Sequence, residues 1–130
     1  MRKILAAGAA GLLLSTAGMA AQEALGTAMT LRGEIVEVSC FSKGVAQSTG
    51  ASHVACAKEC AQKGQPLAVL TEEDGLIKIT GDYAANKYAK LIDFIGKQVE
   101  VRGTSDRYLD YSRAIKATTV TAAARQNQKQ

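Results

Sequence analysis

Short stretches of alternating hydrophobic and polar residues recur along this 130-residue chain, a pattern typical of half-buried β-strands. Five stretches fit a strand by alternation, by apolar content or by β-branched side chains: residues 29–38, 66–70, 76–80, 98–104 and 114–122. Asp74 and Gly75 lie between the second and the third stretch, and an Asp-Gly pair favours the turn of a β-hairpin. The sequence therefore predicts a mainly β fold with five strands.

Two further segments have the features of short helices. Residues 52–63 begin with Ser52, whose hydroxyl suits an N-cap, and Gly64 after them favours a helix end. Residues 82–95 carry apolar side chains at helical spacing, and Gly96 is expected to end this second helix. Its apolar positions are Ala84, Tyr88, Leu91, Ile92 and Ile95. The first helix falls between strands 1 and 2, and the second between strands 3 and 4.

This order of elements is that of the OB-fold, a five-stranded, partly open barrel. Residues 96–103 (GKQVEVRG) and 114–116 (AIK) resemble the corresponding strands of small periplasmic OB-fold proteins of the bacterial envelope. The resemblance covers roughly residues 29–122. It implies a five-stranded OB-fold barrel, with the helix over residues 52–63 inserted between strands 1 and 2. It implies no activity, because this fold hosts many unrelated functions.

The N-terminal 20 residues have the layout of a signal peptide. Arg2 and Lys3 precede an apolar run, and Gly18 and Ala20 fit the small-residue positions before a cleavage site. We therefore expect a signal peptide over residues 1–20, a flexible leader over 21–28, an OB-fold-like domain over 29–122 and a disordered tail over 123–130. An uncleaved anchor is the alternative, since the apolar run is near the minimum length of a membrane-spanning helix. Removal of the signal peptide would leave no membrane-spanning segment. We therefore expect a periplasmic or secreted protein.

The charge of the chain argues against a nucleic-acid partner. Sixteen lysine and arginine residues stand against 12 acidic residues, and without Arg2 and Lys3 the basic excess falls from four to two. So small an excess lacks the basic surface that binds a phosphate backbone. The sequence also presents no Ser-His-Asp arrangement and no glycine-rich phosphate loop, so we expect a non-enzymatic protein.

The chain's three cysteines and its one histidine all lie within residues 40–60. Cys40 follows the first predicted strand, and the other three lie on the first predicted helix. At about 100° per residue, His53, Cys56 and Cys60 fall within an arc of about 60°. The loop after Cys40 allows a third thiol to reach that face. We therefore predict a metal site for Zn or Cu(I), because thiolates and a neutral imidazole suit both ions. Its four ligands are Cys40, His53, Cys56 and Cys60.

Two other interpretations of the cysteines stay open. In an oxidising compartment, a disulfide from Cys40 to Cys56 or Cys60 would staple the helix to the barrel and leave one spare thiol. The protein would then be an OB-fold module that binds a small ligand or a periplasmic protein partner. The third interpretation is thiol redox chemistry. Cys56 lies in the first turns of its helix, which lowers a thiol pKa, but the familiar Cys-x2-Cys spacing is missing.

Overall fold

The computed structural model describes residues 24–44 and 48–124 of the chain. The predicted signal peptide over residues 1–20 lies outside the described residues, as do residues 21–23 of the predicted leader and 125–130 of the predicted tail. None of the helices in the described ranges is long and apolar enough to span a bilayer.

The fold is mainly β, with five strands and a few short helical segments, as the sequence pattern predicts. The strands are β1 (Ala28–Glu37), β2 (Leu67–Thr71), β3 (Gly75–Thr80), β4 (Gln98–Arg107) and β5 (Arg113–Ala122). The α-helices are α1 (Val38–Ser42), α2 (Val54–Gln62) and α3 (Ala85–Tyr88). The 3-10 turns are η1 (Ala51–His53), η2 (Gly81–Tyr83) and η3 (Ile92–Phe94).

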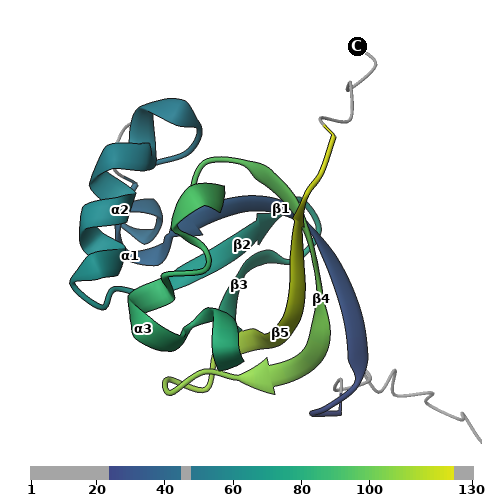
Figure 1. Ribbon diagram of the computed structural model, residues 1–130. Helices are drawn as coiled ribbons and strands as arrows, with labels where there is room; N and C mark the ends of the chain where they lie inside the picture. Colours follow the sequence, from purple (N-terminus) through teal and green to yellow (C-terminus); the bar gives the residue numbers. More distant parts are fainter. Residues whose placement is uncertain (1–23, 45–47, 125–130) are drawn as a thin grey trace, which may run out of the picture.

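The five strands form one mixed sheet whose hydrogen bonds close into a ring. The strand order is β1-β2-β3-β5-β4, and β1 pairs with both β2 and β4. Only the β3–β5 pair is parallel among these strands. Both α1 and α2 lie between β1 and β2 in the chain, and Figure 1 shows them side by side on one flank of the sheet. The predicted insertion between the first two strands is therefore present.

The interior of the ring is filled by branched apolar side chains. Nine of the largest are Ile35, Leu67, Ile77, Ile79, Leu91, Ile95, Ile115, Val99 and Val101, each no more than 1% exposed. They come from all five strands and from the segment between β3 and β4, which supplies Leu91 and Ile95. Burial of each such side chain contributes about 1.5–3 kcal/mol, so this core supplies the main driving force for closing the sheet.

The single helix predicted over residues 82–95 is wrong. The segment instead consists of η2, α3 and η3, and three consecutive residues, Asn86, Lys87 and Tyr88, have φ of +51°, +56° and +60°. A left-handed residue costs about 1–2 kcal/mol in an L-chain. The break still places Tyr88 and Leu91 in the core, and burying such side chains contributes about 1.5–3 kcal/mol each. Packing therefore overrides the local helical pattern.

This left-handed turn leads to a stability prediction. Replacing Lys87 by glycine should raise the free energy of unfolding by about 0.5–1 kcal/mol, because glycine adopts a positive φ without steric cost. Urea unfolding followed by circular dichroism measures the change. In contrast, Lys58→Gly in the right-handed helix α2 should lower the same quantity by about 1 kcal/mol. Equal losses in both variants would contradict the left-handed conformation at position 87.

Candidate metal centre

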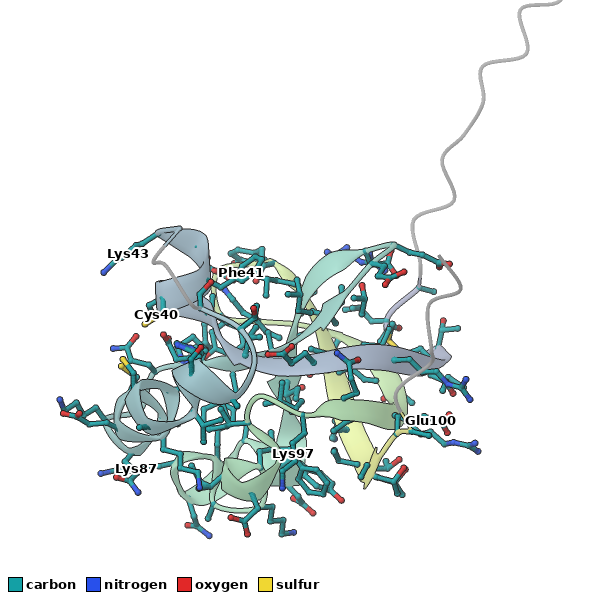
Figure 2. The ribbon with its side chains drawn as sticks, turned by 90° about the horizontal axis from the view of Figure 1, so that it is seen from above. Cys40, Phe41, Lys43, Lys87, Lys97 and Glu100 are labelled. Atoms are coloured by element: carbon teal, nitrogen blue, oxygen red, sulfur yellow. The ribbon has the colours of Figure 1, made fainter. Side chains whose placement is uncertain are left out.

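Three cysteines from two helices gather on one flank of the sheet. Cys40 lies on α1, whereas Cys56 and Cys60 lie one turn apart on α2. Their three sulfur atoms lie within 4.8 Å of one another, and all three cysteines are free thiols. Figure 2 shows Cys40 on the side of α1 that faces α2. Within residues 24–44 and 48–124, this thiol cluster is the one group of three or more His, Cys, Asp or Glu side chains at metal-binding spacing.

Helix α1, which carries Cys40, is held in place by a buried carboxylate. Glu37 is the last residue of β1 and is fully buried. Its two carboxylate oxygens accept hydrogen bonds from the backbone N–H groups of Ser39 at 2.7 Å and Cys40 at 2.8 Å. These N–H groups belong to the first turn of the helix and lack partners within it. Glu37 therefore acts as an N-cap and fixes the position of Cys40 relative to the sheet.

Helix α2 presents its cysteines beside a face that packs on the sheet. Ala57 and Ala61 are fully buried, whereas Cys56 is exposed and Cys60 is half-buried. After the helix, Gly64 has a φ of +88°, and the Gln65 N–H donates to the Cys60 carbonyl at 3.0 Å. This is a Schellman-type ending, which confirms the helix end predicted at Gly64. The small alanines let α2 approach the sheet closely while its cysteines remain at the boundary with solvent.

The thiol cluster lies beside a negative charge that opposes ionisation of the thiols. Hydrogen bonding to the Glu37 carboxylate, followed by burial, raises the pKa of Cys40 to about 12. Burial is the first cause of the raised pKa of Cys60, and Glu37 adds to it. Burial also opposes ionisation of Glu37 itself, but hydrogen bonds from Cys40 and Ser39 outweigh it and lower the pKa of this carboxyl. Protonated thiols are the opposite of the low-pKa thiolates of catalytic redox sites.

The spacing of the sulfurs suits one metal ion. Three sulfurs that each lie about 2.3 Å from a central ion are about 3.8–4.0 Å apart. The sulfurs here lie within 4.8 Å of one another, so side-chain movements of less than about 1 Å bring them into contact with an ion. Rotation about the cysteine side-chain bonds is enough for such a movement. The thiol cluster therefore has the donor set and the size of a site for a thiophilic ion.

His53 is not part of the thiol cluster, which corrects the predicted four-ligand site. Its side chain is only 4% exposed, and its Nε2 atom is buried without a hydrogen-bond partner among the described residues. His53 lies in the 3-10 turn η1, which has 3.0 residues per turn rather than 3.6, so the helical arc assumed from the sequence does not extend to it. The side chain of His53 is buried, as are those of Ala57 and Ala61, whereas Cys56 is exposed.

Glu37 is the functional residue that the sequence pattern missed. Alternation along residues 29–38 places it on the polar side of a strand. In the structure β1 ends at Glu37, and Val38 already belongs to α1. The available signal is an acidic residue three positions before a cysteine, although serine, threonine, aspartate and asparagine are the usual N-cap residues.

Comparisons of the chain with protein-family models, with curated proteins and with solved structures found no match.

Proposed function

We propose that this protein is an exported, non-enzymatic module that binds one thiophilic metal ion, Cu(I) or Zn, through Cys40, Cys56 and Cys60. The observation that carries the proposal is the convergence of three sulfurs from two helices within 4.8 Å. Export is supported by the signal-peptide pattern of residues 1–20. The raised thiol pKa values of Cys40 and Cys60 argue against a low-pKa catalytic thiol, and a metal ion would have to displace their protons on binding.

The domain that carries the site is, in this proposal, an OB-fold barrel of the envelope type. Support comes from the closed order β1-β2-β3-β5-β4, with a helical segment between β3 and β4. The resemblance of residues 96–103 and 114–116 to strands of periplasmic OB-fold proteins also supports this proposal. On this scaffold the metal site is an addition to one flank, because α1 and α2 are inserted between two neighbouring strands.

The coordination chemistry distinguishes the two candidate ions. Three thiolates complete a trigonal site for Cu(I), a soft ion that thiolate ligands select. Zinc normally takes four ligands, so it would need one from outside the thiol cluster, as catalytic zinc sites take water. The exposed position of Cys56 leaves room for such a ligand on the solvent side. Cu(I) is therefore expected to bind more tightly than zinc.

The test is a metal titration of the reduced full chain without oxygen, against a chromophoric competitor. We expect one Cu(I) per chain with thiolate-to-metal absorption, and weaker binding of Zn. His53→Ala serves as the control, and its affinity should be unchanged because His53 lies outside the thiol cluster. Failure of both ions to bind at one per chain would contradict the proposal. A large loss of affinity in His53→Ala would instead show that His53 is a fourth metal ligand.

A further inference from the structure

The three cysteines of the thiol cluster differ in exposure and in the element that carries them. We infer that the cluster is also a redox-controlled site, in which thiol–disulfide exchange joins Cys40 to Cys56 and releases the metal ion. The metal release rests on the proposed function, whereas the choice of the two cysteines depends on the geometry alone.

Exchange begins at Cys56. It is the one exposed thiol of the three, while Cys40 and Cys60 are half-buried. An external disulfide must reach the sulfur that attacks it, and access is one of the factors that set the rate of exchange. The first mixed disulfide therefore forms on Cys56, and the internal disulfide that forms when it resolves contains this residue.

Helix geometry then excludes Cys60 as the second partner. Cys56 and Cys60 are four residues apart on α2, and side chains at this spacing have Cβ atoms about 5–6 Å apart. A disulfide needs a Cβ separation of about 3.5–4.5 Å, so this bond would require α2 to unwind. Cys40 has no such constraint, because it lies on a different helix and its sulfur is within 4.8 Å of that of Cys56.

The reaction consists of two exchange steps. The Cys56 thiolate attacks one sulfur of the external disulfide, whose S–S bond breaks and releases one thiolate. The Cys40 thiol gives its proton to solvent, and its sulfur attacks the Cys56 sulfur of the mixed disulfide. The mixed S–S bond breaks, the Cys40–Cys56 bond forms, and a second thiolate leaves. Two electrons pass from the two cysteines to the external disulfide, which ends as two thiols.

Oxidation removes two of the three metal ligands at once. Cys60 alone then faces the ion, and one thiolate does not make a site that competes for Cu(I) or Zn. The bound ion is released to solvent or to a competing ligand. Reduction of the Cys40–Cys56 bond restores the three thiols, so the disulfide would act as a reversible switch on the site.

Tryptic mapping of the full chain tests the pairing directly, because each cysteine falls in a different peptide. Cleavage after Arg32, Lys43, Lys58 and Lys63 places Cys40 in residues 33–43, Cys56 in 44–58 and Cys60 in 59–63. After treatment of the reduced, metal-free protein with oxidised glutathione, we expect peptides 33–43 and 44–58 to be joined. Peptide 59–63 should carry a free thiol. A cross-link that includes peptide 59–63, a link between two chains or no cross-link would overturn the inference.

Two variants separate the steps. Cys60→Ser should form the Cys40–Cys56 bond at the wild-type rate, whereas Cys56→Ser should be oxidised to an internal disulfide at least about tenfold more slowly. Oxidised wild-type protein should also bind Cu(I) at least about 100-fold more weakly than reduced protein, with recovery on reduction. If the reduced protein binds neither ion but the cross-link forms, the metal function is wrong and the cysteine pairing holds.

Discussion

Replacing Cys60 by serine is expected to lower the affinity of the reduced protein for Cu(I) by at least about 100-fold. Loss of a residue that merely supports a ligand costs about 10–100-fold in metal affinity, and Cys60 is itself a ligand in this site. Serine keeps the shape of the side chain but replaces a soft thiolate by a hard hydroxyl, which Cu(I) binds poorly. Competition titration with a chromophoric Cu(I) chelator gives the affinity.

The matched control is Ala55→Ser, which adds the same serine side chain to an exposed position of the same helix. It should bind Cu(I) as wild type does. Cys60→Ser should also keep its folded circular dichroism spectrum, because the cysteine is only half-buried. Wild-type affinity in the Cys60→Ser protein would show that a two-cysteine site, or no site, accounts for the binding.

Replacing Gly33 by valine is expected to lower the free energy of unfolding by at least about 3 kcal/mol, the upper end of the usual range for overpacking. A Cβ atom at this position would collide with the backbone carbonyl of Leu70, and backbone cannot turn aside as a side chain can. Gly33 lies where β1 passes from its pairing with β4 to its pairing with β2. The collision therefore falls at the point where the ring of strands closes.

Thermal unfolding measures this effect. For a domain of this size each kcal/mol corresponds to about 4–8 °C, so Tm should fall by roughly 12–24 °C. Arg32→Val in the same strand is the control, because Arg32 is exposed and its ion pair with Glu100 lies at the surface. Exposed pairs contribute about 0–1 kcal/mol, so this variant should stay within a few degrees of wild type. A Gly33→Val protein with unchanged Tm would refute the close approach of β1 and β2.

The strands could be predicted from the sequence because each has one face in the core. Apolar and polar side chains therefore alternate along the strand with a period of two residues. The β2–β3 hairpin was also predictable, since Gly75 has a φ of +68° and the Thr71 hydroxyl accepts a hydrogen bond from the Asp74 N–H. These features depend on neighbours in sequence. The prediction of one helix over residues 82–95 was wrong for the opposite reason, because packing against strands that are distant in sequence sets the positions of Tyr88 and Leu91.

The candidate site was partly predictable for the same reason. Cys56 and Cys60 share a face because they are four residues apart on one helix, and sequence spacing alone determines this. Placing Cys40 beside them required α1, whose start depends on a buried N-cap at Glu37 that strand alternation assigns to the polar side. The prediction of His53 as a ligand extends an α-helical period into what is a 3-10 turn. The part of the site that sequence spacing does not predict thus depends on short helical turns at the ends of longer elements.

The way in which the α1–α2 insertion is anchored in β1 and β2 affects the free energy of metal binding. Helix α1 continues directly from β1, α2 is followed after a short connection by β2, and Glu37 is the ladder partner of Leu67. Both stems of the insertion are thus anchored in adjacent, paired strands before any ion arrives. The chain entropy of drawing Cys40 toward α2 is lost when the sheet folds. Preorganisation of this kind strengthens binding, because little further ordering remains for the ion to impose.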